Sequence, residues 1–337
     1  MHNPAIARAA SRALKRPAET ITHQDLAHIE VLPVIGTQNN PCDLHDLRDF
    51  EHLTAMTTLV MGFCQFEQLS ALKTNANMFR MQMNYCGQDS LGALRGLEQL
   101  RELSCGKNGL TSLDGIETLK LDSISMERNN LGDLDGLLTQ PQMTMVWANQ
   151  NPLVDLSALD GLHKMEKLSL GHCAQEGFGS LFEDQLFYLQ SMPALSTLEL
   201  AHNNLQHLGW LEHVPGLTTL NVSGNIDIED FSAIGDLTGL ETLDLTVCTG
   251  LRDITFLERL PRLKTLSLKL CQHIQDFSPL GRLPSLQSLN LDAVPIPHAQ
   301  IATDLIAKGV DVQYQESWIG AQVPPPDARW RLDGQEH

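Results

Sequence analysis

The chain has 337 residues, and 23 Lys and Arg against 41 Asp and Glu give a net charge of −18 at pH 7. An acidic surface of this kind disfavours non-specific binding to nucleic acid or to anionic lipid, and it suits a cationic partner. No apolar run approaches the ~20 residues of a membrane-spanning helix, which excludes an integral membrane protein.

The cysteines and the N-terminal residues indicate the cellular compartment. Seven cysteines, with no CxxC pair, do not form the pattern of a disulfide scaffold or of a cysteine-ligated zinc site. The first residues contain no apolar segment typical of a signal peptide. We therefore expect a cytoplasmic location, with export by a leaderless route as the alternative.

Residues 1–28 are predicted to form a helical N-terminal cap. Apolar residues recur at helical spacing before Pro17, and Thr22 followed by Asp25 predicts the start of a second short helix. Four basic residues lie in this stretch, and we interpret them as part of the cap, with a delivery signal as the alternative. They are Arg8, Arg12, Lys15 and Arg16.

Residues 29–294 carry a repeated motif, L-x-x-L-x-L-x-x-N/C. The spacings between successive repeats are 22, 22, 21, 22, 22, 30, 22, 23, 23 and 23 residues. Eleven units in register identify leucine-rich repeats, and a twelfth, irregular unit starts at Ile29. The eleven begin at Met56, Met78, Leu100, Leu121, Met143, Met165, Leu195, Leu217, Leu240, Leu263 and Leu286.

The repeat predicts an α/β repeat solenoid: a curved leucine-rich-repeat array with a parallel sheet on its concave face, a helical N-terminal cap and a helix–strand C-terminal cap. In each repeat the leucines of a short strand point inward and the intervening residues face solvent. At the N/C position the side chain is expected to bond backbone groups that the turn leaves unpaired. This ladder position is held by Asn108, Asn129, Asn151, Asn203 and Asn225, and by Cys64, Cys86, Cys173, Cys248 and Cys271.

Two segments depart from the regular repeat. An insertion near residues 174–194 predicts a helix that replaces the usual turn and packs on the convex side, with a protruding second contact element as the alternative. Residues 295–337 form the C-terminal cap and tail: a helix over 298–308 is followed by a strand over 310–314 that closes the sheet. The tail 315–337 contains Trp318 and Trp330, and we favour a strap over the last repeat rather than a mobile arm.

Several short sequence motifs resemble those of a known family. They are Arg16-Pro17, Ile21-Thr22 and Asp25-Leu26 in the cap, and the segments 151–159 and 276–280 in the repeats. They are similar to bacterial internalin-like leucine-rich-repeat proteins, over residues 4 to about 294. The resemblance implies a curved solenoid with parallel strands on the concave face and 3₁₀ or extended turns behind. From the residues at both ends we expect neither the signal peptide nor the wall-anchor motif of the exported members.

No pattern for catalysis or for a cofactor is found. The sequence contains no Walker loop, GxGxxG, GxSxG, HExxH or EF-hand motif. About 40 residues without a cysteine follow the last repeat, so we do not expect a cysteine-dependent ligase domain there. His172 and His202 hold equivalent positions in adjacent repeats, where strand stacking brings them within ~5 Å. We favour two solvated histidines on a binding face over a metal pair. The chain is expected not to be an enzyme.

The concave face is therefore the candidate binding surface. Trp147 is unusual there, because a solenoid normally presents a small polar residue at such a position; the alternative is that it lies flat and caps the sheet. Phe79, Tyr85, Arg128 and Trp147 fall within four neighbouring repeats and are expected to form one patch of interface anchors. The full set of predicted partner-binding residues is Phe79, Arg80, Tyr85, Arg101, Lys107, Arg128, Trp147, Gln150, His172, Glu199 and His202.

These features predict a non-catalytic protein–protein interaction module that binds one partner on its concave face, without cofactor, nucleic acid or membrane. The most specific hypothesis is an immunity protein that occludes a basic toxin domain, helped by electrostatic steering. The alternatives are a leaderless secreted effector that binds a host protein and a regulatory subunit of a phosphatase-like enzyme. The oligomeric state is left open.

Overall fold

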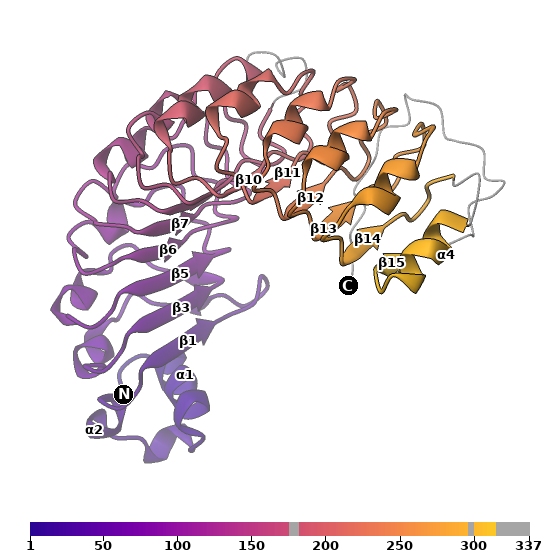
Figure 1. Cartoon of the computed structure of the whole chain (residues 1–337). Coiled ribbons are helices and arrows are strands. Elements are labelled where there is room, and N and C mark those ends of the chain that lie inside the picture. The colour runs from indigo at the N-terminus through magenta and orange to yellow at the C-terminus, as the bar shows by residue number, and fades with distance from the viewer. Residues whose placement is uncertain (175–181, 296–299, 315–337) are drawn as a thin grey trace.

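The strands follow the leucine pattern repeat by repeat. In a computed structural model that describes residues 1–174, 182–295 and 300–314, each regular repeat begins its strand two residues after its first apolar residue, as at Met143 and β8 (Met145–Trp147). The predicted repeats are thereby confirmed. Successive strands lie side by side along the inner side of an arc, and the intervening turns form its outer side (Figure 1).

Among the described residues, thirteen strands form one parallel sheet, and the pairs β1 to β3, β3 to β5 and onward follow chain order. A separate two-stranded sheet joins β2 (Cys42–Asp43) to β4 (Cys64–Gln65). The strands of the large sheet are β1 (Val31–Ile35), β3 (Thr58–Gly62), β5 (Arg80–Asn84), β6 (Glu102–Ser104), β7 (Ser123–Ser125), β8, β9 (Lys167–Ser169), β10 (Thr197–Glu199), β11 (Thr219–Asn221), β12 (Thr242–Asp244), β13 (Thr265–Ser267), β14 (Ser288–Asn290) and β15 (Asp311–Gln313).

Short 3₁₀ segments connect the strands on the outer side of the arc, as the resemblance implies (Figure 1). Many start after an acidic residue whose carboxylate accepts a hydrogen bond from a backbone N–H two residues on, as Asp276 does from Ser278 at 2.8 Å. The connecting segments are η2 (Arg48–His52), η3 (Ser70–Thr74), η4 (Gly92–Leu94), η5 (Asp135–Thr139), η6 (Ser157–Leu159), η7 (Leu186–Ser191), η8 (Gly209–His213), η9 (Ser232–Asp236), η10 (Thr255–Arg259) and η11 (Ser278–Arg282). A further segment, η1 (Ala18–Thr20), precedes β1 in the N-terminal cap.

Both ends of the solenoid are capped as predicted. Helix α1 (Pro4–Leu14) packs against β1, and the short helix α2 (His23–Leu26) begins with a capping box between Thr22 and Asp25. At the other end α4 (Gln300–Ala307) precedes β15, which pairs in parallel with β14. Residues 298 and 299, at the start of the predicted C-terminal helix, lie outside the described residues.

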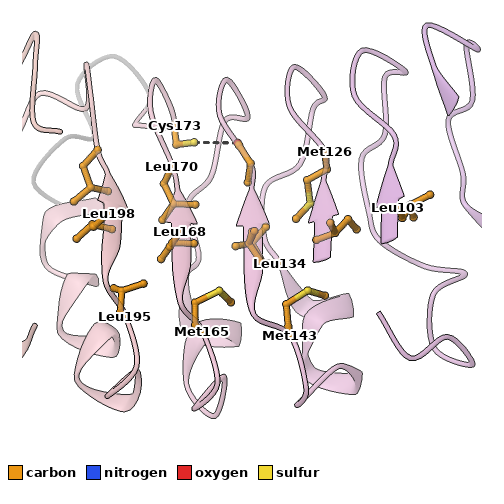
Figure 2. Packing of buried hydrophobic residues seen from close by; sticks show 14 of the residues in the cluster. Leu103, Met126, Leu134, Met143, Met165, Leu168, Leu170, Cys173, Leu195 and Leu198 are labelled. Atoms are coloured by element: carbon orange, nitrogen blue, oxygen red, sulfur yellow. Dashed lines mark hydrogen bonds between the residues drawn. The ribbon is translucent and has the colours of Figure 1, made fainter. Parts of the chain in front are cut away.

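The leucines of consecutive repeats stack into one continuous core. Figure 2 shows Leu168, Leu170, Leu195 and Leu198 of neighbouring repeats lying side by side, and all four are buried. A repeat cannot bury these side chains alone, because the opposing apolar surface belongs to the next repeat.

The ladder of asparagines and cysteines is confirmed. The Asn151 Nδ2 atom donates to the carbonyl oxygens of Met126, at 3.0 Å, and Ala148, at 2.8 Å. Cys173 holds the same place one repeat later, and its thiol donates to the Ala148 carbonyl at 3.3 Å (Figure 2). Burial raises the pKa of Cys173 to about 12, so the thiol keeps the proton that it donates. All seven cysteines are buried and free.

The inserted region is only partly described. Its described end forms η7, and Leu186 and Leu189 of that segment are fully buried. Residues 175–181 of the insertion and the tail 315–337, including the predicted strap, lie outside the described residues.

Within the described residues no helix has both the length and the apolar character needed to cross a bilayer.

Candidate functional site

The concave surface is built from residues that flank one buried position in each strand. In β8 the central Val146 is fully buried, whereas Met145 and Trp147 are half-buried. Trp147 pairs in register with Ser125 on one side and Ser169 on the other. Trp147 is therefore a large, partly exposed indole between two serines of the sheet.

A second row of side chains begins just beyond the strand ends, where each repeat places the residue before the ladder position in the left-handed region. We call it the αL row; φ lies between 53° and 69° at its members, which are Phe63, Tyr85, Lys107, Arg128, Gln150, His172, His202, Gly224, Val247, Leu270 and Ala293.

Hydrogen bonds to the next repeat impose this conformation. The backbone N–H of Gln150 donates to the carbonyl of Gly171, and that of His172 donates to the carbonyl of Ala201, both at 2.8 Å. A left-handed conformation costs a residue other than glycine about 1–2 kcal/mol. Large aromatic and cationic side chains nevertheless fill most of the N-terminal part of the row, which points to a role for the side chains themselves.

Neighbouring side chains of the αL row touch one another. The rings of Phe63 and Tyr85 stack with their centroids 5.1 Å apart. The Lys107 ammonium lies 4.4 Å from the centre of the Tyr85 ring and donates to its hydroxyl. This end of the row combines aromatic faces with a cation.

Further along, the imidazoles of His172 and His202 stack with centroids 4.3 Å apart and planes 13° from parallel. The predicted proximity of this pair is confirmed. Burial lowers the pKa of both rings, and the charges of His202 and Arg128 lower that of His172 further. Both rings are therefore mainly neutral at pH 7, which favours a parallel stack.

A hollow of about 260 Å³ opens beside this pair. Gly171 and Ala201, two small residues, are part of its lining. We call it the central hollow, and its lining is Glu127, Arg128, Asn149, Gln150, Gly171, His172, Glu199, Ala201 and Asn221.

A hydrogen-bond network fixes the polar wall of the central hollow. Asn149 donates to the Glu127 carboxylate at 2.9 Å and accepts from the N–H of Gly171 at 2.6 Å. The Ser169 hydroxyl lies 2.8 Å from the Asn149 amide oxygen and 2.6 Å from the Glu199 carboxylate. In the part of the chain that the structure describes, neither Glu127 nor Glu199 forms an ion pair. Two held carboxylates thus line the hollow together with Arg128, and neither is within ion-pair distance of it.

The structure brings four of the predicted residues together in this hollow: Arg128, Gln150, His172 and Glu199. His202 stacks on His172 directly beside them. Tyr85 and Lys107 lie on the same αL row but nearer the N-terminal end.

The four residues of the expected patch do not all lie together, because Phe79 lies at the opposite ends of the strands from Tyr85 and Arg128. Phe79 precedes β5 and Tyr85 follows it, which separates them by roughly 20 Å at ~3.3 Å per residue. At the Phe79 edge, Arg80 forms an ion pair with Glu102 at 2.6 Å. Arg101 there donates to backbone carbonyls of its own turn. These three predicted residues, Phe79, Arg80 and Arg101, therefore lie apart from the central hollow.

Several residues of the site are not among those predicted from the sequence. Phe63 precedes Cys64 as Tyr85 precedes Cys86, so its position in the repeat is the signal that marks it. Glu127, Asn149 and Gly171 occupy one position at 22-residue spacing, directly before αL-row residues. Comparison of equivalent positions across repeats would have identified both sets.

One group of converging metal-ligand atoms occurs among the described residues, and it lies in the N-terminal cap at His2, His23 and Asp49, away from the central hollow.

Comparison with solved structures identifies the fold. An internalin from Listeria monocytogenes is similar over 85% of this chain and 94% of its own, with a TM-score of 0.61 and 19% sequence identity. A leucine-rich-repeat protein from Leptospira interrogans is similar over 87% of this chain and 80% of its own, with a TM-score of 0.65 and 21% identity. No family model matches the sequence, and no curated protein is similar to it in sequence. The predicted internalin-like leucine-rich-repeat fold is thereby confirmed.

Proposed function

We propose that this leucine-rich-repeat chain is a non-catalytic module that binds a protein partner on its concave face, centred on the central hollow. The observation that carries the proposal is the continuous αL row, which presents large side chains beside that hollow in successive repeats. Arginine and aromatic side chains next to a recess are the usual energetic anchors of protein interfaces.

The electrostatics of the site support a basic partner. The chain carries a net charge of −18, and Glu127 and Glu199 line the central hollow without ion pairs among the described residues. A lysine or arginine of the partner entering the hollow would meet carboxylates already held in place by Asn149 and Ser169. Pre-organised acceptors lose little side-chain entropy on binding.

Within this class, our most specific hypothesis is an immunity protein that covers the active surface of a basic toxin domain. Steric occlusion requires a rigid concave surface and no catalytic groups, and the acidity would accelerate association with a cationic target. A leaderless effector that binds a host protein, or a regulatory subunit of a phosphatase-like enzyme, would use the same surface. These roles differ in the identity of the partner.

The test is affinity capture from the native cell followed by mass spectrometry, with wild type beside two matched triple variants. The site variant carries Arg128→Ala, His172→Ala and Glu199→Ala in the central hollow. The control variant removes the same three residue types outside the sheet, at exposed positions: Arg262→Ala, His163→Ala and Glu212→Ala.

A basic partner that is captured by wild type and by the control variant, but not by the site variant, supports the proposal. Identification of a toxin domain as that partner would support the immunity role, and a host protein or an enzyme subunit would replace it with one of the alternatives. Equal capture by all three proteins would overturn the assignment of the central hollow.

A further inference from the structure

Three side chains from separate segments of the N-terminal cap converge on one point. His2 precedes α1, His23 is the first residue of α2, and Asp49 lies in η2. One ring nitrogen of each histidine and one carboxylate oxygen of Asp49 all lie within 4.8 Å of one another. Nothing in the spacing along the sequence indicates this group, because the fold brings residues 2 and 49 together.

Asp49 is the fixed member of this cluster. Its side chain is completely buried, and its carboxylate accepts hydrogen bonds from the backbone N–H groups of His2, at 2.8 and 3.0 Å, and Asn3, at 2.7 Å. Among the described residues, the one cationic side chain within 4.0 Å is His23, whose Nε2 lies 3.6 Å from the Asp49 Oδ1 atom. A positive partner stabilises a buried carboxylate beyond what its hydrogen bonds supply, and a neutral histidine does not provide one.

The geometry fits a small divalent cation. Zinc takes four ligands at about 2.0–2.2 Å in a tetrahedral arrangement, which places neighbouring ligand atoms roughly 3.3 Å apart. The separation of 3.6 Å between His23 and Asp49 is close to this value. His2 and His23 are exposed, so small side-chain rotations can complete the set and the ion can enter from solvent.

A neighbouring ring holds His23 in place. The imidazole of His52 stacks on that of His23 with centroids 4.1 Å apart and planes 15° from parallel. His52 belongs to η2, as Asp49 does, so one segment supplies a ligand and also orients a second ligand. Contacts that orient ligands are typical of metal sites in proteins.

We propose that His2, His23 and Asp49 bind a divalent transition-metal ion of the zinc class, with solvent in the remaining coordination position. The ion would join the start of α1 to α2 and η2, and it would neutralise the buried carboxylate. This site is independent of the concave face and of the function proposed for it.

The test uses the full chain without a histidine tag and Zn²⁺ as the probe, followed by isothermal titration calorimetry. We expect one saturable site in wild type. His23→Ala should weaken Zn²⁺ binding by more than ~100-fold, because even residues that merely orient ligands account for 10–100-fold in affinity. His2→Ala should also weaken it. His28→Ala, an exposed histidine in the same cap, is the matched control and should bind as wild type does.

Thermal unfolding provides a second readout that requires no partner. Saturating Zn²⁺ should raise the melting temperature of wild type and of His28→Ala, but not that of His23→Ala, because a ligand stabilises the state that binds it. Asp49→Asn removes the buried charge but risks the fold, so the conclusion depends on the two exposed histidines. The proposal is overturned if wild type shows no saturable site, or if Zn²⁺ binds the His23→Ala and His2→Ala variants as tightly as wild type.

Discussion

The imidazole of His202 lies directly over the backbone of Gly224, the next member of the αL row. A Cβ atom at Gly224 would lie 2.3 Å from both the Cε1 and the Nδ1 atoms of that ring. On its other face the ring stacks against His172. Because Gly224 has no side chain, it leaves room for the His202 ring to stack on His172 beside the central hollow.

Gly224→Ala should displace the His202 ring and separate it from His172. The displaced rings become more exposed, so the pKa of each histidine should rise toward its ordinary value of 6.5. The left-handed backbone, with φ of 69°, adds a loss of about 1–2 kcal/mol of stability. NMR titration of the histidine ring protons measures the first effect, and chemical denaturation measures the second.

Gly87→Ala is the matched control for this substitution. Gly87 has φ of 63°, but a Cβ there would meet no atom within 4 Å. It should lose a similar amount of stability and leave the histidine titrations unchanged. Titrations of His172 and His202 that are identical in both variants and in wild type would contradict the role of Gly224.

The His172–His202 pair should make the protein less stable in mild acid. Both pKa values lie below 6.5 in the folded state because burial lowers them; the charges of His202 and Arg128 lower that of His172 further, and Asp244 partly offsets the effect at His202. The unfolded chain then binds more protons as the pH falls below 6.5, so the free energy of unfolding decreases from that point down through the folded pKa values. Above pH 6.5 both states are neutral and the contribution is complete.

Thermal unfolding between about pH 8 and 5 checks this expectation. The double variant His172→Gln, His202→Gln should show a weaker loss of melting temperature on acidification than wild type. Because both rings are only partly buried, we expect a small difference. A steeper acid dependence in the double variant would contradict the sign of the effect.

Much of the fold was predictable because its determinants are local and repeated. Each strand starts where two apolar residues flank two polar ones, and Asn151 or Cys173 marks the turn that follows. Since every repeat has the same pattern of buried residues, a repeat whose own sequence is irregular can be assigned from its neighbours.

The site was less predictable, because its shape depends on contacts between residues of neighbouring repeats. The left-handed turns at Tyr85 and Arg128 are not indicated by residue type, since these residues are not glycine or asparagine; hydrogen bonds to the next repeat impose them. The central hollow arises because Gly171 and Ala201 lie side by side. The cluster at Asp49 requires contact between the cap and the first repeat, which repeat spacing does not encode.

The ladder residues should differ in their contribution to stability. Asn151→Ala leaves the carbonyls of Met126 and Ala148 and the N–H of Leu131 without their side-chain partner in a buried region. We expect a loss of about 2–3 kcal/mol, since each unsatisfied buried group costs about 1–3 kcal/mol.

Cys173→Ala removes a weaker thiol donor, and it should cost less than Asn151→Ala. Equilibrium denaturation of both variants at one pH makes the comparison. An equal loss in the two variants would contradict the view that the asparagine amide, with both donor and acceptor, holds the turn more strongly than a thiol does.

Gly250 and Gly209 should respond in opposite directions to the same substitution. A Cβ at Gly250 would lie 2.0 Å from the backbone oxygen of Ile228 in the preceding repeat, and this rigid atom cannot move without disturbing the turn. Gly250→Ala should therefore destabilise the protein by about 3 kcal/mol. At Gly209 a Cβ would meet nothing within 4 Å and the backbone is not left-handed, so Gly209→Ala should stabilise by about 0.5 kcal/mol through the unfolded chain.

Because a repeat array can unfold in parts, amide hydrogen exchange near Ile228 and Gly250 should accompany global denaturation of both variants. Faster exchange confined to this pair of repeats in Gly250→Ala would locate the damage at the close contact. If Gly250→Ala were as stable as wild type, the backbone of Gly250 would have to lie farther from the Ile228 oxygen than it does in this structure.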